Sequence, residues 1–241
     1  ACHELLHAYA AEHAGAEEDG TQRRAAVHRV TDYYLHTAHA ADRLLDPLRE
    51  PVTLCTPAPG VTADAMTSYE EALAWFQSEQ RVLRAITSLA ARDGFGVAAW
   101  HLAWAQATYF DRHGDCHHWA AMQRIALVAA ERAGDVAGQA HARLGLGRAL
   151  TRLGAYSDAL GHLREALGWF ASLGDSAGQA RTHIELGRTS RAQGNIAVAL
   201  DHAGQALKLA GGAGHLALRA AALSDIGCYR AHREDREDAL A

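Results

Sequence analysis

The sequence predicts an all-α fold in which helical hairpins stack into a superhelix. The main observation is a self-similarity between consecutive stretches: AGQAHARLGLGRALTRLGAYSDALGHLREAL, from Ala137, aligns with AGQARTHIELGRTSRAQGNIAVALDHAGQAL, from Ala177. A second observation is that strand signals are weak along the whole chain. Because a hairpin with one apolar face cannot bury that face alone, consecutive copies are expected to stack.

Each copy is predicted to consist of two helices. A glycine in the first helix lets a neighbour approach closely, a second glycine ends that helix in a left-handed C-cap, and alanines line one face of the second helix. The residues that match in register are Gly147 with Gly187, Gly154 with Gly194, Ala159 with Ala199, and Ala166 with Ala206. The predicted units are 98–137, 138–177, 178–217 and a truncated 218–241.

The repeat resembles the tetratricopeptide repeat. The small residue before the turn, the Gly-x-Tyr turn at Gly154 and Tyr156, and the alanines of the second helix carry the resemblance. The period is longer than that of the family, at about 40 residues instead of about 34. The resemblance implies a right-handed α-solenoid; the alternative is a non-repeating helical bundle.

The N-terminal part is expected to be helical as well. Residues 1–14 form one predicted helix, and 15–97 a helical linker segment with two long helices, Thr21–Leu45 and Ser68–Ala91, capped by Thr21 and Ser68. Between them lies a loop, 46–67, that holds all four prolines. Its apolar residues, Val52, Leu54 and Val61, favour a surface connection packed across the helices.

The order of these segments resembles the C-terminal region of bacterial STAND-type regulators with an NB-ARC nucleotide-binding module, including the Streptomyces antibiotic regulatory proteins. The segments that support this resemblance are HELLHAYA, a Tyr-containing helix, a Pro-rich loop, ALAWFQSEQRVL and the repeats. The family's Met-His-Asp-Leu segment matches CHELL imperfectly, with Cys2 for Met and Glu4 for Asp. The resemblance implies that 1–14 is the tail of a winged-helix domain, and that His3 contacts ADP in the parent protein. For this chain by itself the favoured alternative is that His3 is an exposed histidine on a helix separated from its partner domain.

Composition excludes several function classes. The formal charge of −5, with Lys208 as the single lysine, gives no general attraction to nucleic acid. No stretch is apolar enough to cross a membrane, and four scattered cysteines indicate reduced thiols, so a cytoplasmic location is expected. Without a phosphate-binding loop or a nucleophile motif, the chain is expected to be no enzyme and to hold no cofactor.

The segment HGDCHHW, at 113–119, is the sharpest local cluster. His113, Cys116 and His117 are weak candidates for zinc or copper ligands. However, adjacent histidines point in different directions and a second pair of ligands is missing. We therefore expect a turn between two helices and no metal.

The concave face is the preferred binding site. In a tetratricopeptide array the first helix of each hairpin lines this face at i, i+4, i+7 and i+11. The partner-binding candidates are His141, Arg148, Arg152, Arg181, Glu185, Arg188, Arg191 and Trp104. Further lining positions are His101, Thr108, Gly145, Thr151, Ala192, Asp225 and Cys228. Because arginine pairs with carboxylate and phosphate groups, an acidic peptide, an acidic domain surface or an anionic effector fits. The alternative is that the arginines are solvated or pair with acidic residues of the array itself.

The leading functional hypothesis is a sensor and protein-interaction region of a STAND-type transcriptional regulator, with control of secondary metabolism as a candidate output. Its partners are then the nucleotide-binding domain of the parent protein and a protein, peptide or anionic effector; self-association is also allowed. A free-standing adaptor that binds an acidic peptide in its concave groove is the first alternative. A helical protein that binds a small molecule or metal is the second.

Overall fold

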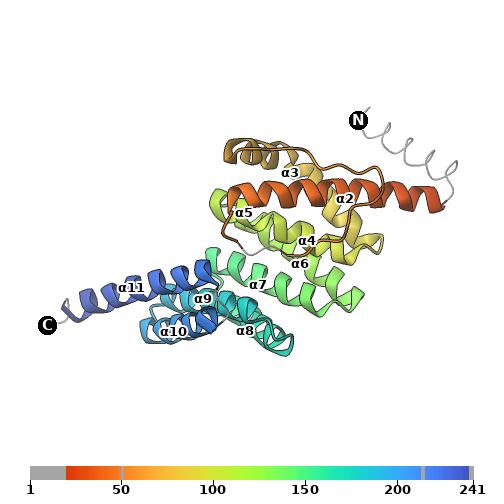
Figure 1. The fold of residues 1–241 in the computed structure, drawn as a ribbon. Coiled ribbons are helices and arrows are strands. Elements are labelled where there is room, and N and C mark those ends of the chain that lie inside the picture. The colour runs from red at the N-terminus through yellow and green to blue at the C-terminus, as the bar shows by residue number, and fades with distance from the viewer. Residues whose placement is uncertain (1–19, 50–51, 213–214, 239–241) are drawn as a thin grey trace, which may run out of the picture.

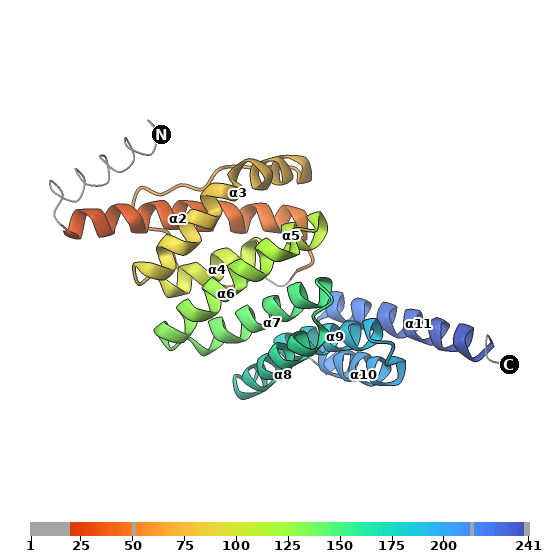
Figure 2. The same cartoon turned by 180° about the vertical axis from the view of Figure 1, so that it is seen from behind.

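The structure, a computed structural model, describes residues 20–49, 52–212 and 215–238. The predicted helix 1–14 and His3 lie outside the described residues. All regular secondary structure within the described ranges is helical. Figures 1 and 2 show α2 and α3 covering one end of a curved array and α11 at its other end. The fold is the predicted right-handed α-solenoid of tetratricopeptide-like hairpins with an N-terminal helical segment.

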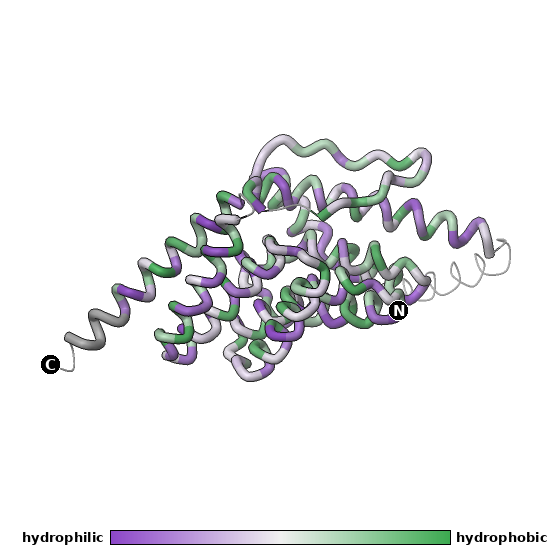
Figure 3. Tube along the Cα trace, turned by 60° about the horizontal axis from the view of Figure 1, so that its bottom comes forward, coloured by the Kyte–Doolittle hydropathy of each residue, from purple (hydrophilic) through white to green (hydrophobic). Residues whose placement is uncertain are grey.

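The helices, in chain order, are α2 (Gly20–Leu45), α3 (Tyr69–Arg92), α4 (Gly96–Ala105), α5 (Ala107–His113), α6 (Cys116–Ala133), α7 (Val136–Arg152), α8 (Tyr156–Ser172), α9 (Ser176–Ala192), α10 (Ile196–Gly212) and α11 (Leu216–Asp238). No helix of the described residues is long and apolar enough to cross a membrane. Figure 3 agrees with this, because hydrophobic and hydrophilic positions alternate along the helices.

Regularly spaced glycines lie in the turns, each between the end of one helix and the start of the next. They have positive φ angles and are Gly94, Gly114, Gly134, Gly154, Gly174 and Gly194. Glycine adopts this conformation without the steric penalty of a Cβ atom. At α9, for example, Gly194 N donates to Arg191 O at 2.8 Å and Asn195 N to Ser190 O at 2.9 Å, which closes the helix end. The predicted caps at Gly154 and Gly194 are confirmed.

Close helix contact within a hairpin depends on glycine, as predicted. A Cβ atom on Gly147 in α7 would stand 2.6 Å from Leu163 Cγ in α8. A Cβ atom on Gly187 in α9 would stand 3.2 Å from Ala199 O in α10. An added Cβ atom would therefore force the Leu163 side chain of α8 to move, and would require a smaller shift of the α10 backbone at Ala199.

The predicted first helix of unit 98–137 is divided, which the sequence did not indicate. It forms α4 and α5, with Gln106 between them. Gln106 is buried, and its Nε2 donates to Leu102 O at 3.0 Å and to Thr87 Oγ1 of α3 at 3.4 Å. The break thus lies where the array packs on the N-terminal helices.

The N-terminal helices share one apolar core with the first hairpins. Leu35 of α2, Phe76 of α3 and Trp119 of α6 belong to the same buried cluster. Ser68 caps α3 as predicted, since its Oγ accepts from Glu71 N at 3.1 Å. The predicted cap at Thr21 is wrong: α2 begins at Gly20, so Thr21 lies inside the first turn.

The Pro-rich connection runs along the helices, as its apolar residues indicated. Val52 and Leu54 pack against the core. The backbone N of Ala58 donates to Asp32 Oδ2 at 2.8 Å, and that of Asp64 to Thr37 Oγ1 at 3.2 Å. Both acceptors lie on α2, so this helix positions the connection.

Candidate functional site

The first helices of successive hairpins, α5, α7, α9 and α11, share one face, which we call the concave face. Four adjoining cavities lie along it, of about 320, 420, 350 and 20 Å³. All eight predicted partner-binding residues line at least one of these cavities: Trp104, His141, Arg148, Arg152, Arg181, Glu185, Arg188 and Arg191. The i, i+4, i+7 pattern therefore located the lining correctly, while its use by a partner stays a prediction.

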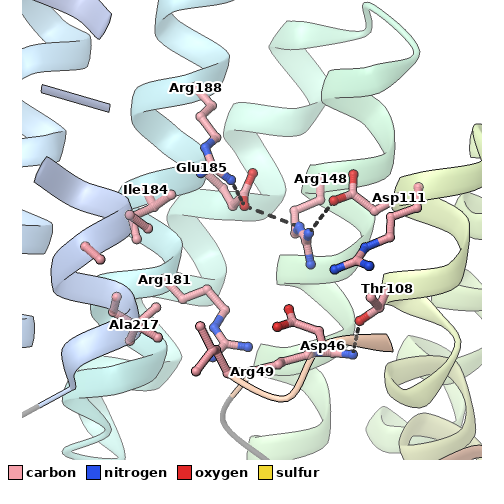
Figure 4. A pocket seen from close by; sticks show the side chains of 15 residues that line it. Asp46, Arg49, Thr108, Asp111, Arg148, Arg181, Ile184, Glu185, Arg188 and Ala217 are labelled. Atoms are coloured by element: carbon pink, nitrogen blue, oxygen red, sulfur yellow. Dashed lines mark hydrogen bonds and ion pairs between the residues drawn. The ribbon is translucent and has the colours of Figure 1, made fainter. Parts of the chain in front are cut away.

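Arg148 is the centre of an ion-pair network. Its Nη2 lies 3.0 Å from Asp111 Oδ2 on α5, and its Nε lies 3.3 Å from Glu185 Oε1 on α9. Its guanidinium also lies over the Trp119 ring, 5.2 Å from the centroid. Asp111 accepts from Arg152 as well, at 2.8 Å. Figure 4 shows Arg148 between the two carboxylates.

Arg188 continues the network toward α11. Its Nη1 lies 3.2 Å from Glu185 Oε1, and its Nε donates to Asp225 Oδ2 at 3.1 Å. Burial raises the pKa of Asp225, and the neighbouring Arg188 opposes that rise. The arginines at 148, 152 and 188 thus pair with acidic residues of the array itself, as the alternative interpretation held.

Two arginines on or beside this face differ from that pattern. Arg191 is exposed, and no carboxylate of the described residues lies within ion-pair distance of it. Arg112 is exposed and lies over the Tyr69 ring at 5.7 Å, again without a described carboxylate partner. These two guanidinium groups are available to an anion without loss of an ion pair within the described part of the chain.

The structure adds Arg49, which the sequence did not single out. Arg49 comes from the Pro-rich connection, is buried, and places its guanidinium 3.5 Å from the centroid of the Trp104 ring. Its Nη1 donates to Asp42 Oδ1 at 2.9 Å and to Thr108 Oγ1 at 3.1 Å. Burial lowers its pKa to about 10, so Arg49 remains charged at neutral pH.

The end of the concave face nearest α4 combines aromatic rings and histidines with Asp175 and Arg181. His141 stacks on Trp100 with ring centroids 5.2 Å apart, and it meets Phe170 edge-on at 5.1 Å. Burial lowers the pKa of His141 to about 3 and that of His101 to about 4. The two histidines are therefore neutral, and positive charge is confined to the arginines.

The segment HGDCHHW forms the turn between α5 and α6, as predicted. His113 stacks on Tyr109 with centroids 4.7 Å apart, and His118 stacks on Phe110 at 5.2 Å. Cys116 and His117 are the first residues of α6. Across residues 20–49, 52–212 and 215–238, no group of three or more His, Cys, Asp or Glu side chains is placed to hold a metal ion.

Comparison with known proteins identifies the repeat. The family model of the tetratricopeptide repeat matches residues 138–211. The crystal structure of BtubC from P. vanneervenii is similar at 17% sequence identity and a TM-score of 0.45, covering 90% of this chain and 93% of that one. No curated protein sequence matches. Residues 138–211 are thus a tetratricopeptide repeat region, which implies a role in protein–protein interaction, and such repeats are typically non-enzymatic.

Proposed function

We propose that the chain binds a partner protein by laying an acidic segment of it along the concave face. The observation that carries the proposal is the row of arginines on consecutive first helices, with Arg148 on α7 and Arg188 and Arg191 on α9. Extended concave surfaces are the usual binding surfaces of solenoid proteins. A planar guanidinium group binds a carboxylate with two parallel hydrogen bonds, so an acidic segment is the matching ligand.

The internal acidic residues support this proposal instead of opposing it. Asp111 and Glu185 hold the Arg148 side chain between α5 and α9 at 3.0 and 3.3 Å. A guanidinium group fixed in this way loses less conformational freedom when a ligand binds. Because only some of its N–H groups face the internal carboxylates, others remain to donate to a partner.

We further propose that this interaction serves a STAND-type transcriptional regulator in the cytoplasm, and that control of secondary metabolism is its output. The support is the order of the segments HELLHAYA, the helix Gly20–Leu45, the Pro-rich connection, ALAWFQSEQRVL and the repeats. In such a protein the repeat region holds the nucleotide-binding domain inactive. A partner that binds one state better then shifts the equilibrium toward the active state.

A peptide-display selection against the folded chain tests the binding proposal. Selected peptides are expected to carry several Asp or Glu residues, and to shift the amide signals of α7 and α9 in NMR spectra. A scrambled peptide with Asn and Gln in place of the acids is the control, and is expected to bind at least tenfold more weakly. Enrichment of neutral or basic peptides, or signals that shift on α8 and α10 instead, contradicts the proposal.

The regulator proposal has its own test. The reading frame preceding Ala1 is expected to encode a phosphate-binding loop, and the longer protein to bind ADP in equilibrium dialysis. Replacing His3 with Ala in the longer protein is expected to weaken ADP binding several-fold. A longer protein without nucleotide affinity contradicts the regulator and leaves the peptide adaptor.

A further inference from the structure

One cavity of the concave face, of about 320 Å³, has two chemically different walls. One wall carries the charged groups already described, among them Asp111, Arg148 and Glu185. The other wall is mainly apolar, with Arg181 of α9 as its charged side chain, and its apolar residues are Leu48, Ile184, Ala217, Leu218, Ala220 and Ala221. Figure 4 shows Ile184 and Ala217 on one side of the cavity and Asp111 and Thr108 on the other, with the Arg181 side chain extending between them. Its volume is at the lower end of the range for small-ligand sites.

The repeat itself explains why space is present on the α11 side. In successive repeat units, one lining position holds His101, His141 and Arg181, and then Ala221. Likewise Arg148 and Arg188 are followed by Cys228. Helix α11 thus replaces large polar side chains by small ones where it faces the arginines of α9. The α11 side of this cavity is therefore less polar than the corresponding positions of the other hairpins.

Leu48 lines this cavity and is largely exposed to solvent. Its side chain is 73% exposed, although it lies next to buried Arg49 on the connection that α2 and α5 hold in place. Exposure of a leucine side chain to water is unfavourable, and the free energy falls when an apolar group covers it. The anchoring of Arg49 by Asp42 and Thr108 holds Leu48 at the cavity.

We propose that this cavity binds an amphipathic carboxylate: an apolar group that lies against Leu48 and Ala221, with an adjacent carboxylate directed at the arginine side. The inference rests on the proposed function, because it specifies which part of an acidic segment is anchored. The same chemistry occurs in a free aliphatic acid and in an aliphatic residue beside Asp or Glu in a peptide. The cavity adds selectivity for the apolar group to the charge preference of the whole face.

The test uses both sources as probes. Acetate, decanoate and decanol are titrated separately and followed by NMR of alanine and isoleucine methyl groups. Two peptides, acetyl-GDDLDDG-amide and acetyl-GDDSDDG-amide, form the second arm. Decanoate is expected to bind at least tenfold more tightly than acetate or decanol and to shift the Ala217, Ala221 and Ile184 methyl signals. The leucine peptide is expected to bind at least threefold more tightly than the serine peptide.

Two variants locate the site. Ala221→Arg restores at this position the residue that α9 carries, and is expected to abolish decanoate binding because its side chain fills the cavity. Leu223→Arg, at an exposed position of α11 outside the cavity lining, is the matched control and is expected to leave binding unchanged. Thermal unfolding of each variant checks that the array remains folded.

A third variant tests the apolar wall from the side of the connection. Leu48→Ser removes an exposed apolar group without touching the core, and is expected to weaken decanoate binding about threefold while acetate binding stays the same. Decanoate binding that Leu48→Ser leaves unaltered contradicts the placement of the apolar group against Leu48.

The outcomes separate the cavity from the proposed function. The cavity inference is overturned if the leucine and serine peptides bind equally well, and if both bind Ala221→Arg as tightly as the unaltered chain. The concave-face proposal stands in that case. Decanoate binding that Ala221→Arg abolishes, with no binding of any acidic peptide, supports the cavity and contradicts the peptide function. Failure of all probes overturns both.

Discussion

Arg148 and Asp111 connect two consecutive first helices across the concave face, with 3.0 Å between Arg148 Nη2 and Asp111 Oδ2. The same carboxylate accepts from Arg152 at 2.8 Å. One acidic residue thus neutralises two of the arginines that face the cavities. The pair therefore has two roles that can be measured separately, namely the stability of the α5–α7 contact and the charge offered to a partner.

Asp111→Asn is expected to lower stability and strengthen binding of acidic segments. The lost ion pairs are partly exposed, so the free energy of unfolding should fall by about 1 kcal/mol. Two guanidinium groups lose an internal partner, and affinity for an acidic peptide should rise several-fold. Urea unfolding and peptide titration measure the two effects. Asp201→Asn, exposed on α10, is the control; weaker peptide binding by Asp111→Asn contradicts the expectation.

Gly147→Ala tests the close approach of α7 and α8. Because its Cβ would stand 2.6 Å from Leu163 Cγ, the buried Leu163 side chain or the helices must move. The free energy of unfolding should therefore fall by about 1–3 kcal/mol. Gly161→Ala in α8 is the matched control, since no heavy atom lies within 4 Å of its added Cβ. That change should raise stability by up to about 1 kcal/mol. Equal effects of both changes in a denaturant titration would disprove the packing argument.

The Asp42–Arg49 pair tests how the Pro-rich connection is held. The side chains are 0% and 7% exposed, so Arg49→Met leaves a buried carboxylate without its partner, at a cost of about 3–5 kcal/mol. The double change Asp42→Leu with Arg49→Met removes both charges and should recover at least half of that loss. Urea unfolding of the single and double variants gives the comparison. If the double variant is less stable than Arg49→Met, the loss of stability in Arg49→Met does not come from an unpaired Asp42 carboxylate.

Acid should destabilise the chain through its buried histidines. Burial lowers the pKa of His101 to about 4, below the ordinary 6.5, so the folded state binds fewer protons than the unfolded state between these values. The contribution of His101 to stability is complete above about pH 6.5 and is lost as the pH falls toward 4. For this residue, which is 5% exposed, the slope is about 1.4 kcal/mol per pH unit.

Unfolding measured in urea at pH 7, 6 and 5 checks this expectation. His101→Gln should reduce the pH dependence, whereas His113→Gln at an exposed position should not. An unchanged slope in His101→Gln would show that other groups cause the acid effect.

Most of the fold could be predicted from local sequence patterns. Regularly spaced glycines marked the helix ends, and the i, i+4, i+7 rule found the residues that line the concave face, including Arg181 and Glu185. What the sequence did not reveal depends on contacts between distant segments. Arg49 enters the face because Asp42 and Thr108 hold it, and Thr108 lies far from it in the chain.

Two further features were missed for related reasons. Asp111 precedes a turn and looks like an ordinary helix-end acid until α7 places Arg148 and Arg152 beside it. The break at Gln106 has no proline or glycine to signal it, and arises where α4 meets α3. Sequence patterns and helix propensities do not contain this information, because tertiary contacts decide the partners of Asp111 and the position of the break at Gln106.

The most direct test of binding through the concave face is a charge reversal that breaks no internal ion pair. Arg191→Glu meets this condition among the described residues, and Arg164→Glu, exposed on α8, is its matched control. The affinity of a selected acidic peptide is measured for both variants at low and moderate salt. Binding through the concave face predicts that Arg191→Glu weakens peptide affinity at least tenfold and that Arg164→Glu has no effect. It also predicts that the unaltered chain binds the peptide more weakly at moderate salt than at low salt. Equal affinity of the unaltered chain and Arg191→Glu would contradict it.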